Sequence, residues 1–366
     1  MRRFKRVLLG VVFAVSAVAG TAGWASGNAQ QPVTGPPPGA AAWSADRSLG
    51  RALPDPARAE PERVAAFFAG LAPAERRLLL ERHPLIVGNL DGVPVALRYE
   101  ANARAVRGTP YERLARDGRR ILAFDPRGRG QVAEVYGDLA TARRVAVVVP
   151  GSDTDAGSFD RPGKGHRVVA GMAKALRDAA VRTTGPAPGH GPGHRADPPG
   201  APGTATAVIA WTGYTTPVGV GIDAATGDLA EAGAPRLARF TRGLTAVGAP
   251  RPSLFCHSYG SVVCGLAAAD AHASDIVVFG APGMRADSVA DLGTDARVWA
   301  ARNADDWIAR VPNVELFGLG HGEDPASGGF GARRVPAREA AGHDGYFAPG
   351  TDSLRAFAAI ARGELR

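Results

Sequence analysis

Cysteine is scarce in this sequence of 366 residues, which contains only Cys256 and Cys264. Two cysteines cannot form the multi-bridge framework that holds small secreted domains together, so the fold must depend on a hydrophobic core. Hydrophobic residues make up 45% of the chain, which is enough for a core of ordinary size. The sequence leaves open whether the two cysteines form one disulfide or remain thiols.

A concentrated basic surface is absent as well. The formal net charge is +8, but Arg2, Arg3, Lys5 and Arg6 contribute four of these charges at the N-terminus. The other arginines are interleaved with Asp and Glu, and no basic stripe with aromatic residues between its charges occurs. The sequence therefore predicts no nucleic-acid partner.

Clusters of metal ligands are also missing. His190 and His194 lie close in sequence, but no cysteine or carboxylate accompanies them at the spacing of a metal site. They fall within residues 183–206, a stretch of Gly, Pro, Ala and polar residues that cannot bury apolar surface and predicts a disordered insertion. We expect neither a metal nor an organic cofactor.

The first 29 residues have the pattern of a targeting segment. A cationic start is followed by an uncharged apolar run from Val7 to Ala19 and then by small residues, which predicts a signal peptide. A membrane anchor is the alternative, because the uncharged stretch continues to Asn28. We expect a secreted or extracytoplasmic protein, anchored to a membrane only if this segment is not cleaved.

Residues 30–59 are rich in Pro and Gly, a composition that predicts a flexible tether. Residues 60–118 form a predicted helical region. One helix begins at Pro61, and its apolar residues recur on one face: Val64, Phe67, Phe68 and Leu71. A second helix is expected from Pro73 until Pro84 stops it. This region is too short for a core of its own, so we expect it to pack on the main domain.

Strand and helix patterns alternate over residues 119–366. Strands are predicted at residues 121–124, 132–136, 145–149, 207–211, 253–256, 275–279 and 297–301, and helices at 165–182, 228–247, 260–271 and 353–362. The first two strands read as a hairpin, and the continuous β-branched run at 145–149 is typical of a parallel strand buried on both faces. These patterns predict an α/β protein with a mostly parallel central sheet, helices on both faces and an N-terminal helical appendage.

The most informative motif is Cys256-His257-Ser258-Tyr259-Gly260, which lies between a predicted strand and a predicted helix. In the α/β-hydrolase fold such a corner presents a nucleophilic serine, and it needs small residues two positions before and after the serine. Gly260 meets the second need, and Cys256 stands where a glycine is usual. We therefore predict that Ser258 is the nucleophile.

A serine nucleophile needs a histidine base and a carboxylate that orients the base, and in this fold they follow the serine in the order acid, then histidine. Asp305 and Asp306 follow a predicted strand, and we favour Asp306. Of the later histidines, His321 and His343, we favour His343 because its loop precedes the last helix. His257 is expected to serve in packing or in a hydrogen bond.

An acyl-transfer site also needs N–H donors for the oxyanion. Tyr259, directly after the serine, and Ser152, in the loop after the strand at 145–149, are the expected donors. Trp211, Tyr214 and Phe347 could line an acyl pocket or belong to the core, and the sequence does not separate these alternatives.

These residues resemble an α/β-hydrolase family first catalogued as a domain of unknown function in high-GC Gram-positive bacteria. The resemblance covers residues 60–362 apart from the insertion. The matching motifs are Asn89-Leu90-Asp91-Gly92-Val93-Pro94, Arg98, Ala101-Asn102, Val148-Val149-Pro150-Gly151, Trp211-Thr212-Gly213-Tyr214, His257-Ser258-Tyr259-Gly260-Ser261, Asp306-Trp307-Ile308 and Gly342-His343-Asp344-Gly345-Tyr346-Phe347. The resemblance implies the α/β-hydrolase fold and a Ser-Asp-His triad but no particular substrate.

The expected function is hydrolysis of a carboxylic ester or related acyl bond through an acyl-enzyme, on a small-molecule or lipid substrate. Two alternatives stay open. One is an acyltransferase that passes the same acyl group to an alcohol, and the other is a cell-surface binding protein with an inactive triad.

Overall fold

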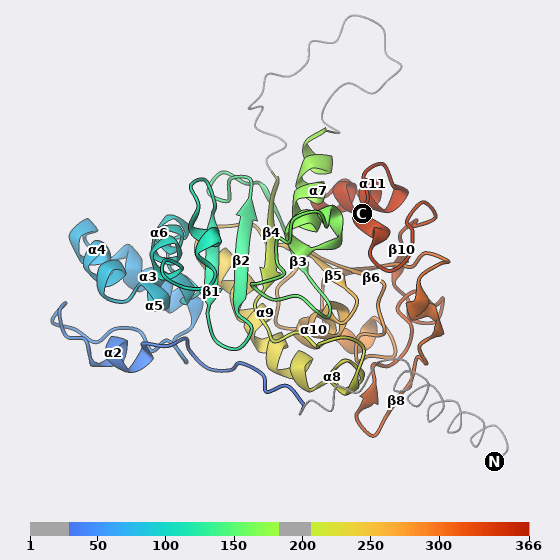
Figure 1. Cartoon of the computed structure of the whole chain (residues 1–366), viewed down its shortest axis with the longest axis horizontal. Coiled ribbons are helices and arrows are strands. Elements are labelled where there is room, and N and C mark those ends of the chain that lie inside the picture. The colour runs from blue at the N-terminus through green and yellow to red at the C-terminus, as the bar shows by residue number, and fades with distance from the viewer. Residues whose placement is uncertain (1–28, 183–205, 366) are drawn as a thin grey trace, which may run out of the picture.

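A computed structural model describes residues 29–182 and 206–365 of the chain (Figure 1). The predicted signal peptide lies outside the described residues except for its last position, and so does the predicted insertion, with His190 and His194, except for Thr206. In the described part, no helix combines the length and the apolar character that a membrane span requires.

An eight-stranded sheet forms the centre of the molecule, with strand order β1-β2-β4-β3-β5-β6-β7-β10. The strands are β1 (Ile121–Asp125), β2 (Gln131–Tyr136), β3 (Arg144–Val149), β4 (Thr206–Thr212), β5 (Ser253–His257), β6 (Asp275–Phe279), β7 (Arg297–Ala301) and β10 (Arg333–Arg334). Within this sheet, β2 alone runs opposite to the other seven strands. Every residue of β4, β5 and β6 is buried, as expected for parallel strands covered on both sides.

Helices cover both faces of this sheet (Figure 1). The helices that cover it are α7 (Val169–Arg182), α9 (Asp228–Ala246), α10 (Gly260–Ala267) and α11 (Asp352–Arg362). Side chains of α9 and α10 share one apolar core with one face of the sheet, and those of α7 and α11 share a second core with the opposite face. This arrangement confirms the predicted fold class, a mostly parallel α/β sheet between two helical layers.

The N-terminal helical region contains more helix than the sequence predicts. It comprises α3 (Pro61–Ala69), α4 (Pro73–Arg82), α5 (Pro84–Asn89) and α6 (Val95–Ala105). Pro84 does end α4, but it also begins α5, because its fixed φ suits a first helical turn and its missing N–H costs nothing there. The region has a small apolar cluster of its own, which includes Val64, Phe68 and Leu79.

Two asparagines attach this region to the edge of the sheet. The Asn89 side chain donates to the Phe124 carbonyl oxygen (2.6 Å) and accepts from the Phe124 N–H (2.9 Å), so its amide pairs with β1 as a neighbouring strand would. Asn102 donates to the Ile121 carbonyl oxygen (3.1 Å). These bonds cover the open edge of β1, which explains why the polar Asn102 is buried on α6.

The expected flexible tether, residues 30–59, instead packs against the rest of the chain. The Val33 N–H donates to Thr215 Oγ1 (3.0 Å), and Arg127 donates to the carbonyl oxygen of Thr34 (2.9 Å). A short helix, α2 (Ala40–Ala45), buries Trp43, whose indole N–H donates to the Pro54 carbonyl oxygen (2.7 Å). Composition alone predicted flexibility, but one buried aromatic residue and a few specific hydrogen bonds hold this segment in place.

Candidate active site

Ser258 occupies a sharp corner between the end of β5 and the start of α10. Its φ is 52°, in the left-handed region that residues with a side chain rarely adopt. The Ser258 N–H donates to the carbonyl oxygen of Phe279, the last residue of the neighbouring strand β6 (3.0 Å). The side chain is partly exposed although the residues on both sides of it are buried. Such a strained and accessible position is typical of a functional residue.

The corner is packed so closely that two glycines are required beside it. A Cβ on Gly260 would lie 2.6 Å from the carbonyl oxygens of both Val149 and Pro150. A Cβ on Gly151 would lie 2.6 Å from the Cβ of Ser258. The loop that follows β3 therefore touches Ser258 directly. A methyl group at either glycine would push this loop and the corner at Ser258 apart.

Cys256 and Cys264 form a disulfide, with an S–S distance of 2.08 Å, which resolves the question that the sequence left open. The disulfide links the end of β5 to α10 and so spans the corner that holds Ser258. Cys256 occupies the position where the motif usually has glycine, and both cysteines are fully buried. The described part of the chain contains no free thiol.

Asp306 and His343 form a hydrogen-bonded pair at the carboxyl edge of the sheet. Asp306 follows β7 and caps the short helix η4 (Trp307–Arg310), accepting the N–H of Ile308 (3.0 Å). The same oxygen, Oδ1, accepts a hydrogen bond from His343 Nδ1 (2.8 Å), and Oδ2 accepts one from the Tyr346 hydroxyl (2.6 Å). Asp306 is thus the aspartate in contact with the histidine.

Asp305 points elsewhere. Its side chain is exposed, and its backbone N–H donates to Asn303 Oδ1 (2.9 Å). Of the two adjacent aspartates, Asp306 is therefore the partner of His343, in agreement with the choice made from the sequence.

The surroundings of Asp306 keep its carboxylate charged. Burial alone would raise its pKa, but the hydrogen bonds from His343 and Tyr346 outweigh burial, so that the pKa lies below its ordinary value. A charged Asp306 requires the proton of a neutral His343 to sit on Nδ1, which leaves Nε2 with a free lone pair. An imidazole in this form is ready to accept a proton from a hydroxyl.

Ser258 and His343 lie at the same end of the molecule. His257 Nε2 donates to the carbonyl oxygen of His343 (2.9 Å), and the two imidazole rings are 4.7 Å apart. Gly280, directly after the Phe279 that binds the Ser258 backbone, is so near the pair that a Cβ on it would lie 3.0 Å from His343 Cε1. The exposed indole of Trp307 packs on the other side, 4.8 Å from the His343 ring.

His257 and His321 are buried, and both face backbone carbonyl groups. Burial lowers the pKa of His257 to about 3, helped by the nearby His343, and burial lowers the pKa of His321 to about 4. His321 Nε2 donates to the Ala224 carbonyl oxygen (2.8 Å). Both are therefore neutral structural histidines, and His321 is already engaged away from Asp306. His257 supports the backbone of His343, a role that its position beside the serine suggested only in general terms.

The two expected oxyanion donors border Ser258. Tyr259 is the N-cap residue of α10, where backbone N–H groups have no acceptor within the helix. Its hydroxyl is fixed by Ala230 N–H (3.2 Å) and by the Thr226 carbonyl oxygen (2.9 Å). Ser152 follows Gly151, which touches the serine, and the next residue, Asp153, has a φ of 60°.

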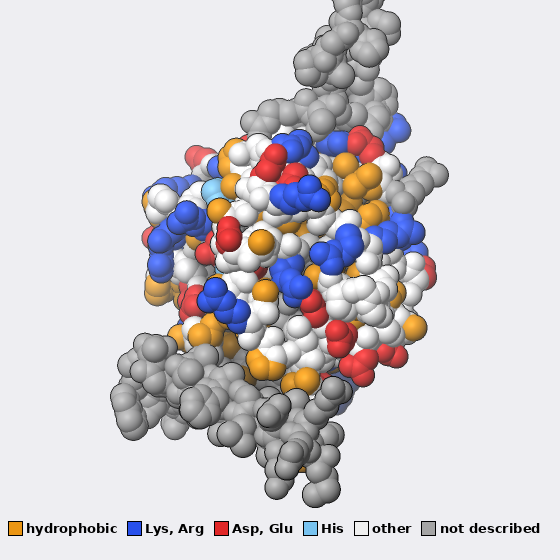
Figure 2. Space-filling view, turned by 90° about the vertical axis from the view of Figure 1, so that its right-hand side faces the viewer, with side chains coloured by type: hydrophobic (Ala, Val, Ile, Leu, Met, Phe, Trp, Pro, Cys, Tyr) orange, Lys and Arg blue, Asp and Glu red, His pale blue; other side chains and the backbone are white. Residues whose placement is uncertain are grey.

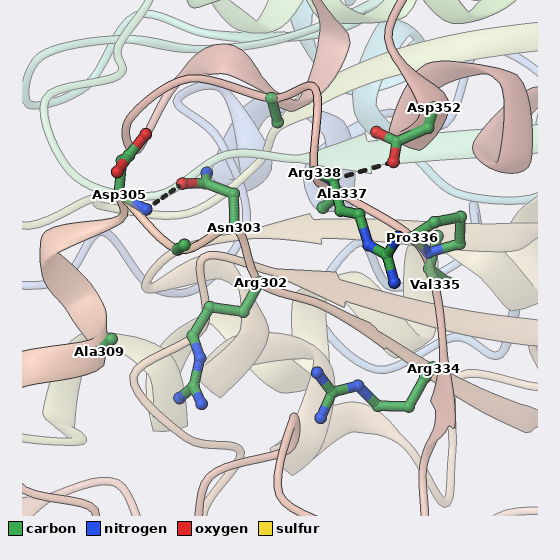
Figure 3. A pocket seen from close by; sticks show the side chains of 12 residues that line it. Arg302, Asn303, Asp305, Ala309, Arg334, Val335, Pro336, Ala337, Arg338 and Asp352 are labelled. Atoms are coloured by element: carbon green, nitrogen blue, oxygen red, sulfur yellow. Dashed lines mark hydrogen bonds between the residues drawn. The ribbon is translucent and has the colours of Figure 1, made fainter.

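A cavity of about 950 Å³ opens beside Asn303 and Asp305 (Figure 3). It is lined by Arg302, Asn303, Asp305, Arg334, Arg338 and Asp352, among others, and neither Ser258 nor His343 belongs to its lining. Trp211, Tyr214 and Phe347, the candidates for an acyl pocket, are buried in the two apolar cores. Among the described residues, no group of three or more metal-ligating side chains is gathered.

Comparison with known proteins agrees with this architecture. A family model described as alpha/beta hydrolase matches residues 125–316, more than half of the chain. An uncharacterized protein of Mycobacterium tuberculosis is 29% identical over 395 residues, which cover 85% of this chain and 57% of the relative. An uncharacterized protein of Mycobacterium bovis is 30% identical over 202 residues, covering 54% of this chain and 69% of the relative. The chain thus spans little more than half the length of the first of these relatives.

Solved structures show distant likeness. A dienelactone hydrolase from Anabaena variabilis matches with a TM-score of 0.36 and 15% identity, covering 64% of this chain and 90% of that one. An α/β serine hydrolase without a lid from Xanthomonas campestris matches with a TM-score of 0.36 and 14% identity, covering 68% and 95%. At these scores the likeness carries no argument about activity. The family match and the strand order together show that this protein belongs to the alpha/beta hydrolase family.

Proposed function

We propose that the protein is an exported serine hydrolase that cleaves a carboxylic ester or related acyl bond through an acyl-enzyme. The observation that carries this proposal is the joint position of two features at one edge of the sheet. Ser258 stands at a left-handed corner, and beside it the Asp306–His343 pair, bound through Nδ1, leaves Nε2 of the imidazole for a proton.

In the proposed first step, Ser258 Oγ attacks the carbonyl carbon of the substrate while His343 Nε2 takes the hydroxyl proton. Asp306 stabilises the imidazolium that forms, because its carboxylate already accepts a hydrogen bond from the Nδ1–H group of His343. The oxyanion of the tetrahedral intermediate is bound by the N–H groups of Tyr259 and Ser152. When the intermediate collapses, the leaving alcohol takes the proton from His343, and the acyl group stays on Ser258.

In the second step, water attacks the acyl-enzyme and gives one proton to His343 Nε2. The new intermediate collapses to release the carboxylic acid, and His343 returns the proton to Ser258 Oγ. An added alcohol in place of water would give a new ester, so product analysis with and without an alcohol separates a hydrolase from an acyltransferase.

Export is part of the proposal and rests on two supports. The first 29 residues have the composition of a signal peptide, and the disulfide between Cys256 and Cys264 suits an oxidising compartment. The proposed substrate is accordingly a small-molecule or lipid ester that is met outside the cytoplasm.

Hydrolysis of p-nitrophenyl acetate and butyrate tests the chemistry. We expect Ser258→Ala to lower kcat/KM by about 10⁴-fold or more, because the nucleophile is lost. Ser288→Ala, at a surface serine hydrogen-bonded to Asp291, is the matched control and should keep the wild-type rate. Full activity in a folded Ser258→Ala variant would contradict the proposal.

A further inference from the structure

Large exposed apolar side chains gather in two segments of the described chain. One segment runs from the end of β4 to the first residue of α8 (Ile222–Ala225). The other is the hairpin formed by β8 (Glu315–Leu316) and β9 (Leu319–Gly320), with the residue before it. We call these six residues the apolar rim: Val218, Val220, Ile222, Val314, Leu316 and Phe317. They make up six of the ten exposed large hydrophobic residues in the described part, and the side chain of Phe317 is 94% exposed. A gathering of this kind indicates a binding surface, whereas single exposed apolar residues do not.

The two segments of the apolar rim are neighbours. Thr226, directly after α8, forms a β-bridge with Leu319 of the hairpin. Two residues after Leu319, His321 donates a hydrogen bond to the carbonyl oxygen of Ala224 in α8. In Figure 1, α8 and β8 lie together at the lower edge of the molecule, below the carboxyl ends of the parallel strands. The rim is therefore one surface rather than two separate patches.

This surface also borders the candidate active site. The carbonyl oxygen of Pro217 accepts the N–H of Asp153 (2.8 Å), and Asp153 Oδ1 accepts the N–H of Gly219 (2.9 Å), so the first segment rests on the loop that carries Ser152. The hydroxyl of Tyr259 donates to the carbonyl oxygen of Thr226, which is bridged to Leu319 of the second segment. The apolar rim is therefore bonded to both segments that carry the proposed oxyanion donors, Ser152 and Tyr259.

Unpaired positive charge lies beside the same site. Arg161, Lys164 and Arg167 are exposed, and none of them forms an ion pair with an acidic residue of the described chain. The short helix η2 (Gly165–Arg167) packs against η5 (Gly345–Phe347), which begins two residues after His343. The only acidic residue of the hairpin, Glu315, is neutralised by Arg285 (2.8 Å).

The point where the chain enters the described structure lies on this side too. The Gln30 N–H donates to Asp223 of α8 (3.2 Å), and the Gln30 side chain donates to the Thr216 carbonyl oxygen (3.1 Å). The preceding sequence contains the apolar run from Val7 to Ala19 with its cationic start. An N-terminus that meets a membrane would therefore bring α8 and the apolar rim to the same membrane.

We propose that the apolar rim docks on an anionic lipid surface, with Phe317 and its neighbours entering the interface and Arg161, Lys164 and Arg167 against the headgroups. An apolar contact and a basic patch together give the two signals that stable but reversible membrane binding needs. Basic and acidic side chains are mixed over the middle of the face in Figure 2, and hydrophobic ones are visible at its lower margin. If the proposed function holds, the substrate is an ester drawn from that lipid surface.

The absence of free cysteines in the described chain allows a direct test in the full-length protein. Phe317→Cys is labelled with the environment-sensitive dye NBD and mixed with phosphatidylglycerol vesicles. We expect a shift of the emission to shorter wavelength and roughly a twofold or greater rise in intensity, because the dye enters the apolar interface. Ala140→Cys, in an exposed turn before β3 at the opposite edge of the sheet, is the matched control and should not respond.

The other outcomes of this experiment count against the proposal. A dye at position 317 that stays in water while the protein binds vesicles would mean that the N-terminal segment alone makes the contact. A dye already shielded without vesicles would mean that this chain or a second copy covers the rim. An equal response at positions 317 and 140 would mean adsorption without orientation.

The basic residues supply an independent measure. Replacing Arg161, Lys164 and Arg167 together by Gln should weaken binding to phosphatidylglycerol vesicles by roughly 10- to 100-fold, and should have little effect with neutral phosphatidylcholine. Equal binding by the triple variant and the wild type would contradict the role of these charges. Vesicle binding requires no turnover, so the loss of ester hydrolysis in any variant, or its absence altogether, tests the proposed function separately.

Discussion

The described part of the chain contains two Asp–His pairs that look alike and differ in their surroundings, each with a buried aspartate. Asp46 accepts a hydrogen bond from His83 Nε2 (2.7 Å) in the N-terminal region, and Asp306 accepts one from His343 Nδ1 (2.8 Å) at the carboxyl edge of the sheet. The distances are nearly equal. The bond between carboxylate and imidazole therefore cannot by itself distinguish a structural pair from a catalytic one.

The neighbours of each pair make the difference. His83 packs edge-on against Trp43 (5.4 Å), and Arg82 shares the carboxylate of Asp46 (3.1 Å), so that this pair ties residues 30–59 to α4. The hydrogen bonds from Ser48 and His83 lower the pKa of Asp46 below its ordinary value. The pair is fully engaged in holding two segments together.

His343, by contrast, keeps part of its ring accessible, with a side chain 15% exposed against 7% for His83. Its free nitrogen is Nε2, and a serine in left-handed conformation stands at the same edge of the sheet. In the proposed function, the second pair differs from the first by having a serine hydroxyl at the same edge of the sheet, and not by a stronger Asp–His bond.

The largest expected effect comes from truncating each histidine in turn. We expect His343→Ala to lower kcat/KM for p-nitrophenyl butyrate by about 10³- to 10⁵-fold with little loss of stability, because the general base is lost. His83→Ala should leave kcat/KM within about threefold of the wild type and lower the free energy of unfolding by about 2–4 kcal/mol, because it removes a buried side chain and leaves Asp46 unpaired. Steady-state kinetics and urea unfolding check both variants. The reverse pattern would exchange the roles of the two pairs.

The second effect concerns the space around Ser258. A Cβ introduced by Gly151→Ala would lie 2.6 Å from the Ser258 Cβ, so the serine must shift. We expect about a 100-fold loss of kcat, since a displacement of about 1 Å at the reacting atom costs that much. Gly328→Ala, where the structure has open space around the new methyl group and φ is not in the left-handed region, is the matched control and should keep kcat. An unchanged rate in Gly151→Ala would show that the loop after β3 does not constrain the nucleophile.

A smaller effect is expected from the third partner of Asp306. Tyr346→Phe removes the hydroxyl that donates to Asp306 Oδ2 (2.6 Å) while keeping the ring in its packing. Without that bond the pKa of Asp306 rises and the orientation of its carboxylate loosens, so we expect roughly a tenfold loss of kcat/KM. The pH profile of kcat/KM should show the loss growing toward acid. A uniform loss at all pH values would indicate a packing defect instead.

Two buried histidines that have no carboxylate partner, His257 and His321, extend the comparison to stability. The pKa of His257 is about 3 and that of His321 about 4, both below the unfolded value of roughly 6.5. Between each folded-state pKa and pH 6.5, the unfolded chain binds more protons than the folded protein does. The free energy of unfolding is therefore at its full value above pH 6.5 and falls as the pH drops toward 4, by about 1.4 kcal/mol per pH unit for each histidine. Urea unfolding at pH 7, 5.5 and 4.5 measures the slope, and His321→Gln should reduce it. An identical slope in that variant would contradict the assignment.

The sequence predicted the centre of the fold well because buried parallel strands have an unmistakable pattern. The bounds of β6 and β7 agree with the prediction to the residue, since these strands are continuous apolar runs between turn residues. Helix α6 was missed because Arg98 and Asn102, buried for their hydrogen bonds, interrupt the apolar periodicity. Contacts between distant segments decided the outcome there, and local pattern does not record them.

The candidate site shows the same division. The corner at Ser258 was predictable from strand, motif and helix in order, which is a local signal. The choice between Asp305 and Asp306 depends on how Asn303 turns the loop, and the contribution of Tyr346 depends on the packing of two loops 40 residues apart in sequence. The motif around His343 already contained Tyr346, but only the fold showed that its hydroxyl reaches Asp306.

Labelling with a fluorophosphonate followed by peptide mapping tests the central claim most directly, because the probe reports which serine has an activated hydroxyl. The account predicts one adduct, on Ser258, that is retained in His83→Ala, is strongly reduced in His343→Ala and is absent from Ser258→Ala. An adduct on another residue, or none in folded wild-type protein, would contradict it.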